Sequence, residues 1–341
     1  MRKWYAISAS LLLLVFSLSA CTAQPTEEPP APPPVVVEGP FRVAVVMPSA
    51  INDLAFSQSM YDALLAIQAD LGADNFEIAY SESMFVVDDA AAAIRDYAAE
   101  GFDLVIAHGS QYGSSLVEIA PDFPETSFAH GTTVDTFTDE GVTNVFAYEA
   151  RSEQGGYVNG VIAASLSDSG VIGVVGPIET GDAKLYVEGF AAGARATNPD
   201  IQVNINWIGS FSDVAMASEA AQTHINAGAD VLTGTAQMVV GAIGVAEEND
   251  ALWFGTQANQ ASLATGNVVA SQVYHWEVVL SEIVDLIKGG TLGGTAYAID
   301  LANGGEVIEF NPDYDLPADV ADLAQVTIDG IADGSIQVPL P

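Results

Sequence analysis

The chain has almost no cysteine, since Cys21 is the only one among its 341 residues. A single cysteine excludes a disulfide framework and a zinc site built from several thiolates. Common catalytic motifs are also missing: the sequence contains no Gly-x-Ser-x-Gly, no His-Glu-x-x-His and no phosphate-binding loop ending in Gly-Lys-Ser/Thr. We therefore expect a protein that is not an enzyme and that needs neither a cofactor nor a metal.

Basic residues are scarce as well. The chain has 8 Lys and Arg against 45 Asp and Glu, which gives a formal net charge of −37 at pH 7. Such a surface repels phosphates, so nucleic acid is an unlikely kind of partner and none is expected. The acidic residues are scattered and form no block, which indicates a solvated surface. We expect the chain to be a monomer.

The first 20 residues have the pattern of a secretory signal peptide. Arg2 and Lys3 precede an apolar run over 9–18 that is too short to span a membrane well. Cys21 directly follows small residues, which is the pattern of lipid attachment in bacterial lipoproteins. Residues 21–40 are rich in proline and predict an extended tether. A lipid-anchored protein on the extracytoplasmic face of the cell membrane is expected.

Strand-like and helix-like segments alternate from residue 41 onward. Apolar runs such as 43–46 and 104–107 are typical of strands buried on both faces of a parallel sheet, and segments with helical spacing separate them. The pattern restarts near residue 148, so we predict an α/β fold with two doubly wound lobes. A ligand cleft is expected between the lobes.

The predicted boundaries follow from this alternation. The first lobe is expected over 41–147 and the second over 148–256, with part of 257–290 returning to the first lobe. Residues 291–341 are expected to form a hairpin around Asn303-Gly304-Gly305, followed by a tail, and to span the lobes.

Aromatic and polar side chains follow several predicted strands, and open parallel sheets bind ligands at that edge. Asp53 and Phe56 follow the first strand, Phe211 follows a strand of the second lobe, and Gln237 and Gln257 follow two others. Aromatic walls with a few hydrogen-bonding groups suit a flat heterocycle. A simpler interpretation stays open, in which Asp53 caps a helix and the two phenylalanines are core residues.

The histidines leave further alternatives. His108 and His130 lie at the ends of predicted strands, so a catalytic or metal-binding pair is possible beside an ordinary hydrogen-bonding role. His224 lies between the polar residues Gln222 and Asn226 and is expected to be exposed.

Several segments, in order, resemble the basic membrane protein family, the lipid-anchored substrate-binding proteins of ABC importers that include the purine nucleoside receptors. The resemblance covers nearly all of residues 41–339. The segments that carry it are Ile51–Phe56, Asp103–Ile106, Gln154–Gly160, Val187–Gly193, Asn198–Asp200, Gly209–Asp213, Gly228–Val231 and Ile336–Pro339.

The resemblance implies a type I periplasmic-binding-protein fold, in which two lobes close on a ligand about a hinge. It implies an ABC permease as partner and a purine nucleoside or purine base as ligand. Phe56 and Phe211 would stack on the two faces of the purine, and Asp53 would contact the heterocycle.

The sequence also departs from the family. Nucleoside receptors carry ribose-binding aspartates where this chain has Gln257 and His130, and an asparagine where it has Ser57. An amide is a weaker acceptor for a diol than a carboxylate, so a free base or another heterocycle becomes a candidate ligand. Trp276 falls where base-binding relatives place an aromatic side chain near the pocket.

The resemblance therefore favours a binding protein that delivers a purine to an ABC permease. Two alternatives stay open. One is a heterocycle-sensing regulatory lipoprotein that is not coupled to transport, and the other is a nucleoside hydrolase-type enzyme.

Overall fold

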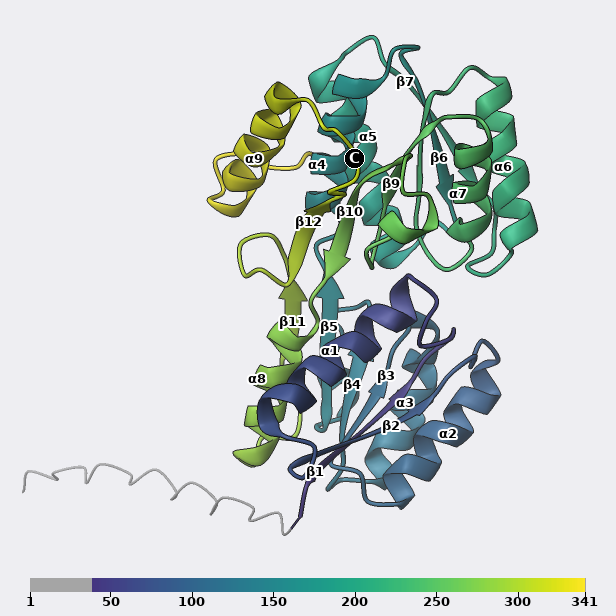
Figure 1. The fold of residues 1–341 in the computed structure, drawn as a ribbon. Coiled ribbons are helices and arrows are strands. Elements are labelled where there is room, and N and C mark those ends of the chain that lie inside the picture. Colours follow the sequence, from purple (N-terminus) through teal and green to yellow (C-terminus); the bar gives the residue numbers. More distant parts are fainter. Residues whose placement is uncertain (1–38, 341) are drawn as a thin grey trace, which may run out of the picture. The chain divides into compact units, whose positions relative to one another are not determined.

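The computed structural model describes residues 39–340, which form two α/β lobes (Figure 1). This arrangement confirms the predicted fold class. The predicted signal peptide, Cys21 and nearly all of the tether lie outside the described residues. Within the described part, no helix combines the length and the apolar character that crossing a membrane requires.

The first lobe contains a six-stranded sheet in which every strand pair is parallel. Its strands, in spatial order, are β11 (Ala296–Ile299), β5 (Val145–Ala150), β4 (Ser127–Gly131), β3 (Leu104–Ala107), β1 (Phe41–Val46) and β2 (Phe76–Ser81).

Helices cover both faces of this sheet, which explains why its central strands β1 and β3 contain continuous apolar runs. Val43 and Val45 of β1 pack with α1 (Phe56–Leu71) and α8 (Glu277–Lys288). Ala44 and Val46 pack on the opposite face with α2 (Val87–Ala99) and α3 (Gly113–Ile119). The alternation follows from the two-residue period of a strand.

The second lobe is built in the same way. Its strands, in spatial order, are β12 (Glu306–Phe310), β10 (Val268–Tyr274), β9 (Leu252–Gly255), β8 (Val231–Gly234), β6 (Val171–Gly176) and β7 (Gln202–Trp207). Only β12 is antiparallel to its neighbour. The helices α4 (Glu153–Leu166), α5 (Gly181–Thr197) and α9 (Ala318–Ala332) contribute to one core cluster, and α6 (Val214–Asn226) and α7 (Val239–Glu248) to another.

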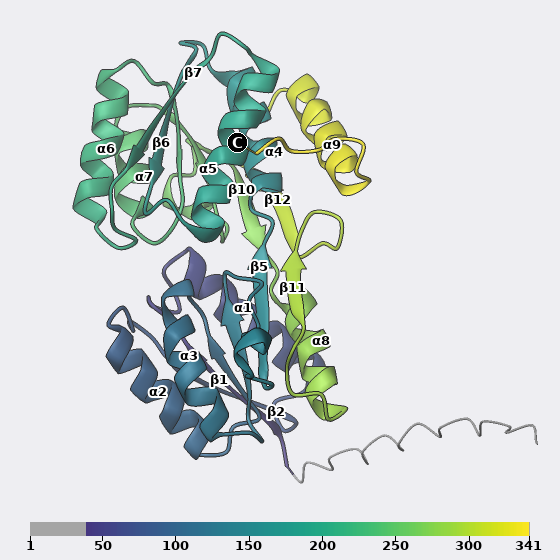
Figure 2. The same cartoon turned by 180° about the vertical axis from the view of Figure 1, so that it is seen from behind.

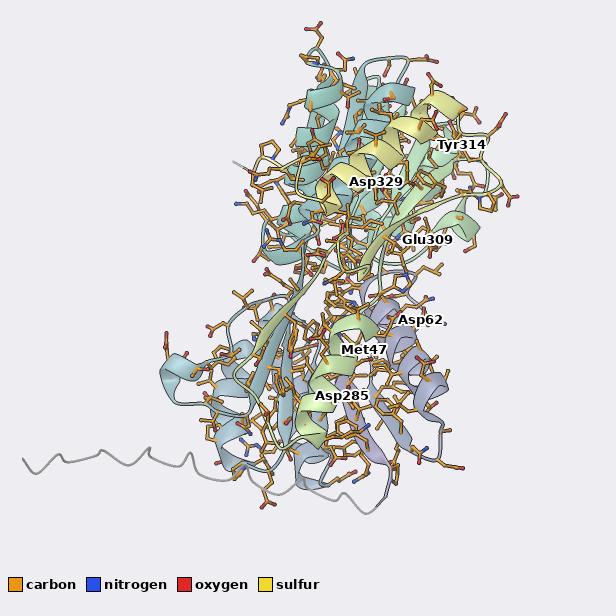
Figure 3. The ribbon with its side chains drawn as sticks, turned by 90° about the vertical axis from the view of Figure 1, so that its left-hand side faces the viewer. Met47, Asp62, Asp285, Glu309, Tyr314 and Asp329 are labelled. Carbon is orange, nitrogen blue, oxygen red and sulfur yellow. The ribbon has the colours of Figure 1, made fainter. Side chains whose placement is uncertain are left out.

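Short 3₁₀ helices lie in the connections. They are η1 (Ser110–Tyr112), η2 (Ala120–Asp122), η3 (Thr138–Glu140) and η4 (Ala261–Leu263). The acidic residues are spread over both lobes, as Asp285 on α8 and Asp329 on α9 illustrate (Figure 3).

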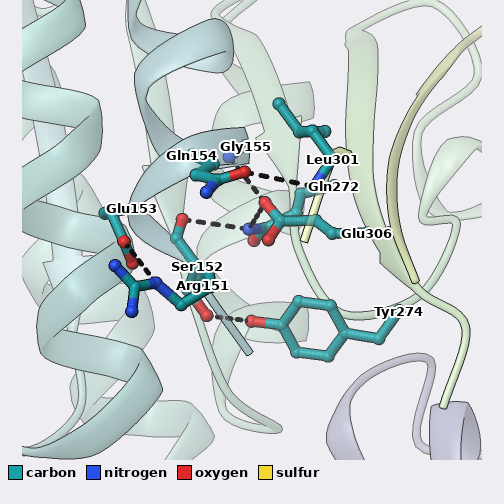
Figure 4. Close-up of polar contacts among 9 residues, drawn as sticks. All are labelled: Arg151, Ser152, Glu153, Gln154, Gly155, Gln272, Tyr274, Leu301 and Glu306. Carbon is teal, nitrogen blue, oxygen red and sulfur yellow. Dashed lines mark hydrogen bonds and ion pairs between the residues drawn. The ribbon is translucent and has the colours of Figure 1, made fainter. Parts of the chain in front are cut away.

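The chain passes between the lobes more than once, because α8 and β11 belong to the first lobe although they follow strands of the second (Figure 2). The crossing segments bond to one another. The backbone N–H of Arg151 donates to the carbonyl of Ile299 over 2.9 Å, and that of His275 donates to the carbonyl of Gly305 over 2.7 Å. Side chains add to these bonds, for example between the hydroxyls of Ser152 and Tyr274 (Figure 4).

The predicted hairpin around Asn303-Gly304-Gly305 is wrong. β11 pairs with β5 in the first lobe, whereas β12 pairs with β10 in the second. The turn itself is made as turn chemistry predicts, since Gly304 has a φ of 74° and the Asn303 side chain accepts from the N–H groups of Asp300 and Gly305. A turn determines only the local path of the chain. Here the strand before the turn, β11, joins the sheet of the first lobe, and the strand after it, β12, joins the sheet of the second.

Glycines bring α4 and α5 unusually close together. A Cβ added at Gly193 would lie 2.1 Å from the Tyr157 carbonyl oxygen, and one added at Gly160 would lie 2.1 Å from the Phe190 carbonyl oxygen. These glycines belong to the segments that carry the family resemblance. Their role is the close packing of α4 against α5.

Candidate ligand-binding site

A cavity lies between the two lobes at the carboxyl ends of their parallel strands, where open α/β sheets bind ligands. The space among its lining residues has a volume of about 520 Å³, which includes open solvent. From the first lobe it is lined by Pro48, Phe56, Phe85, Gly109, Ser110, Gln111 and Thr132; from the second by Thr180, Gly181, Asp182, Ala183, Phe211, Ala236, Gln237 and Gln257.

Two phenyl rings line this cavity from opposite lobes. Phe56 is the first residue of α1 and is 7% exposed, whereas Phe211 lies in the loop after β7 and is half-buried. The hydroxyl of Ser210 accepts from the backbone N–H groups of Ser212 and Asp213, which orders the Phe211 loop. The site therefore brings together the two aromatic residues that the sequence singles out.

His108 supports Phe56 from behind. The two rings are stacked, with centroids 3.7 Å apart and planes 9° apart. His108 Nε2 lies 3.0 Å from the Phe56 carbonyl oxygen, which only accepts, so Nε2 carries the proton. Burial lowers the pKa of His108 to about 3, so the ring is neutral and its Nδ1 accepts from the Tyr148 hydroxyl at 2.7 Å. His108 thus positions Phe56 without lining the cavity.

The loops around the cavity have strained backbone. Thr132, Ala236 and Gln257 have φ values of 63°, 76° and 70°, in the left-handed region that non-glycine residues rarely adopt. Each follows the end of a strand, namely β4, β8 or β9. Residues held in such conformations concentrate at binding sites, so the strain supports the assignment of this cavity.

Polar atoms in the cavity wall lack partners. The oxygens concerned are Thr132 Oγ1, both carboxyl oxygens of Asp182, Gln237 Oε1 and Gln257 Oε1, all buried and without a hydrogen-bond partner among residues 39–340. Buried polar groups in native proteins are nearly always hydrogen-bonded. These atoms are therefore available to a ligand.

Asp182 is the one ionisable side chain among the residues that line the cavity, and none of them is Lys, Arg or His. Burial, followed by the charges of Glu149 and Glu153, raises its pKa to about 8, although the backbone N–H groups of Ala150 and Asp182, which lie nearby without forming a hydrogen bond to it, act the other way. The cavity thus offers no cation to an anionic ligand.

Two predicted site residues support the cavity without lining it. Asp53 accepts hydrogen bonds from the backbone N–H groups of Ala55, Ser57 and Gln58 at 2.9 to 3.2 Å, so it caps the start of α1. The hydroxyl of Ser57 accepts from the N–H of Ser49 at 3.1 Å. Together these bonds order the loop that presents Phe56. The sequence left open whether Asp53 contacts the ligand or caps a helix. Its contacts in the structure are those of a helix cap.

Two others lie elsewhere. His130 is buried beneath α3, where its ring stacks on Phe137 with centroids 5.3 Å apart, and it borders a separate surface depression. Trp276 is fully buried, donates to the hydroxyl of Ser59 at 3.0 Å and packs edge-on against His108. Neither side chain lines the cavity.

The structure also bears on the predictions made for His224 and for the pair His108 and His130. His224 is 2% exposed, so the predicted exposure is wrong; its ring packs against Gly173 and bonds the Val174 carbonyl at 3.2 Å. His108 and His130 have separate surroundings, as described above. Within the described residues, no group of three potential ligands from His, Cys, Asp and Glu could hold a metal ion.

The sequence analysis did not single out Asp182, Thr132 or Gln111, which line the cavity. Asp182 lies in the first turn of α5, where an acidic residue is ordinary because it interacts with the helix dipole. Asp182 could have been predicted as a site residue because, like Phe56 and Phe211, it lies in the connection that follows a buried strand or at the start of the next helix. Thr132 likewise follows β4 directly.

Comparison with known proteins identifies the family and supports the fold. A family model described as ABC transporter substrate-binding protein PnrA-like matches residues 41–328. A solute-binding protein of an ABC transporter system from Conexibacter woesei has a similar structure, with a TM-score of 0.72 and 24% identity; the match covers 88% of this chain and 99% of that one.

Two relatives are named for different roles. A purine-binding protein of Brucella abortus is 27% identical, over 77% of this chain and 73% of its own length. The transcriptional activator protein Med of Bacillus subtilis is 28% identical, over 83% of this chain and 87% of its own length. Because the family model covers most of the sequence, the chain belongs to the PnrA-like family of ABC transporter substrate-binding proteins.

Proposed function

We propose that this protein binds a purine nucleoside or purine base between Phe56 and Phe211 and delivers it to an ABC permease. The observation that carries this proposal is the pair of phenyl rings that line one cavity from two lobes. Aromatic rings bind flat heterocycles by stacking, and each stacked base contributes about 1–3 kcal/mol. The Brucella abortus relative, a purine-binding protein, supports the same ligand class.

The polar lining supports an uncharged ligand. Gln237 and Gln257 carry amides that both donate and accept, and Thr132 adds a hydroxyl. With Asp182 as the one ionisable group in the lining, phosphorylated nucleotides would meet no compensating cation. Nucleosides and free bases fit these groups. Gln257 stands where nucleoside receptors carry a ribose-binding aspartate, so a free base is as good a candidate as a nucleoside.

The proposed location follows from the leader sequence. Lipid attachment at Cys21 would hold the protein on the extracytoplasmic face of the membrane, and residues 22–40 would tether the folded part. There it would capture its ligand and present it to the permease. Binding needs no cofactor and breaks no bond.

We expect Phe211→Ala to weaken purine binding by about 1–3 kcal/mol, or about 5- to 150-fold in Kd, because it removes one stacking face. Phe211 is half-buried in a loop, so the variant should stay folded. Calorimetric titration with adenosine, inosine, adenine and hypoxanthine measures the change, with a flavin and a sugar as ligands of other classes.

Phe310→Ala is a matched control, because Phe310 lies on β12, is 36% exposed and does not line the cavity. It should bind purines as the wild type does. Wild-type protein that binds no purine, or equal affinity of the Phe211 variant and the wild type, would count against the stacking assignment.

A regulatory role through the same cavity is the second candidate, because one relative is named a transcriptional activator. Uptake of a labelled purine by cells with and without the gene separates the two. Transport requires uptake to fall when the gene is deleted, whereas regulation leaves uptake unchanged while the expression of other genes changes.

A nucleoside hydrolase is the third and weakest candidate. Prolonged incubation with adenosine followed by chromatography tests it directly, since released adenine would show cleavage. We expect the nucleoside to be recovered intact.

A further inference from the structure

Asp182 is a buried acid that the fold leaves without a partner. It lines the ligand cavity, its side chain is 5% exposed, and neither carboxyl oxygen has a hydrogen-bond partner among the described residues. A buried polar group without a partner is costly, since it loses its bonds to water and gains none. A bound ligand would supply the missing partner.

Acidic and phenolic groups surround Asp182. Glu149 and Tyr148 come from β5, Glu153 from α4, Tyr274 from β10 and Glu306 from β12. All of these groups are neutral or negative.

Two cations lie close in sequence to these acidic groups, and both are already paired. Arg151 Nε lies 2.9 Å from Glu153 Oε1 (Figure 4), and Lys184 Nζ lies 3.7 Å from Glu179 Oε1 and 3.6 Å from Glu188 Oε1. Of the two oxygens of Glu306, Oε1 accepts from the N–H of Gly155 and from Gln272 Nε2, whereas Oε2 is buried without a partner. The surroundings of Asp182 therefore oppose a negative charge on it.

We propose that Asp182 is a specificity-determining residue that, as a neutral carboxylic acid, donates one hydrogen bond to the ligand and accepts another from it. This inference deepens the proposed function and depends on it. A carboxylic acid held neutral by an apolar or acidic site is a known means of donating a hydrogen bond near pH 7. The raised pKa of Asp182, about 8, agrees with this state.

The complementary ligand presents an acceptor and a donor side by side. Adenine does so with a ring nitrogen next to its amino group, and hypoxanthine does so with its carbonyl next to a ring N–H. The amides of Gln237 and Gln257 can rotate so that their donor and acceptor exchange places. They therefore do not distinguish ligands by the arrangement of donor and acceptor. We therefore infer a preference for neutral adenine- and hypoxanthine-type purines over purine riboside, which lacks the exocyclic group.

The pH dependence of binding gives the sharpest test. The empty protein binds only while Asp182 holds its proton, so the apparent Kd is the intrinsic Kd divided by the protonated fraction. That fraction falls as pH rises through the pKa of about 8, so adenosine should bind roughly tenfold more weakly at pH 9 than at pH 7. Calorimetric titration of the purified protein with adenosine at both pH values measures this change.

Two variants separate the neutral acid from other roles. Asp182→Ala should weaken binding by about tenfold or more at pH 7, because both hydrogen bonds are lost. Asp182→Asn keeps one donor and one acceptor without titrating, so it should rescue much of that loss and should remove the pH dependence. Asp322→Asn, at an exposed position on α9, is the matched control and should behave as the wild type.

Each other outcome rejects the proposal in a distinguishable way. Wild-type affinity that is equal at pH 7 and pH 9, or an Asp182→Ala variant that binds as the wild type, would remove Asp182 from recognition and leave the proposed function standing. Affinity that rises with pH would mean that the ionised carboxylate is the acceptor. Failure of wild-type protein to bind any purine at pH 7 would overturn the proposed function, and this proposal with it.

Discussion

Asp182→Asn is expected to raise the free energy of unfolding by about 4 kcal/mol at pH 7, because the wild-type fold holds a buried carboxyl that would ionise freely once unfolded. The pKa of this carboxyl is about 8 in the folded protein, against 3.8 for an unperturbed aspartate. Between these values the folded state binds more protons than the unfolded state. The contribution of Asp182 to the stability of the wild type therefore becomes more unfavourable as pH rises from about 4 to about 8, and it levels off above that.

Asparagine does not titrate, so the stability difference between variant and wild type should widen over the same pH interval. Chemical denaturation at about pH 5, 7 and 9 measures it. Asp322→Asn controls for the loss of one negative charge on an acidic protein and should show no such widening. A difference that stays constant with pH would mean that Asp182 is ionised in the fold.

This expected gain in stability has a functional interpretation. A residue whose replacement stabilises the protein by several kcal/mol has not been selected for stability, and binding sites commonly retain such residues. The stability measurement tests whether Asp182 is neutral in the folded protein, and the binding measurement tests whether it contacts the ligand. The two results are independent, and together they support the proposed role.

Gly193→Ala is expected to lower the free energy of unfolding by about 3 kcal/mol, because the added methyl group would overlap the backbone of α4. The new Cβ would lie 2.1 Å from the Tyr157 carbonyl oxygen and 2.8 Å from its carbon. Neither atom belongs to a side chain that could turn away, so the helices α4 and α5 would have to move apart. Thermal or chemical denaturation measures the loss.

Gly244 provides the matched control on a helix of the same lobe. A Cβ at this position of α7 meets nothing within 4 Å. Gly244→Ala should be neutral or should stabilise the protein by about 0.5–1 kcal/mol, because alanine favours the helix. Equal effects of the two substitutions would show that helix propensity, and not close packing, decides the result at Gly193.

Much of the fold could be predicted from the sequence because its strands are buried on both faces. Continuous apolar runs such as Val43 to Val46 identify them, and the alternation with helices gives the two lobes. The hairpin prediction failed because Asn303-Gly304 specifies a turn but not the partner of each arm. Helix α9, at residues 318–332, was expected only as part of a tail.

The site was predictable where aromatic residues lie in the connections that follow strands, as Phe211 does after β7 and Phe56 does at the start of α1. A place near the end of a strand was not sufficient for His130 of β4, whose ring stacks on Phe137 and does not line the cavity. His224 was misjudged because its polar neighbours Gln222 and Asn226 are two positions away, and residues at that spacing face other sides of a helix. The importance of Asp182 depends on burial by distant segments, which no local pattern encodes.

The central claim is that one cavity holds a purine between Phe56 and Phe211, with Asp182 at the edge of the ring. A crystal structure of the protein grown with adenosine tests it most directly. The account predicts the purine ring stacked between the two phenyl rings, with a carboxyl oxygen of Asp182 within about 3 Å of a ring nitrogen and the other within reach of the amino group. Adenosine bound elsewhere, or bound in the cavity without contact to either phenyl ring, would contradict it.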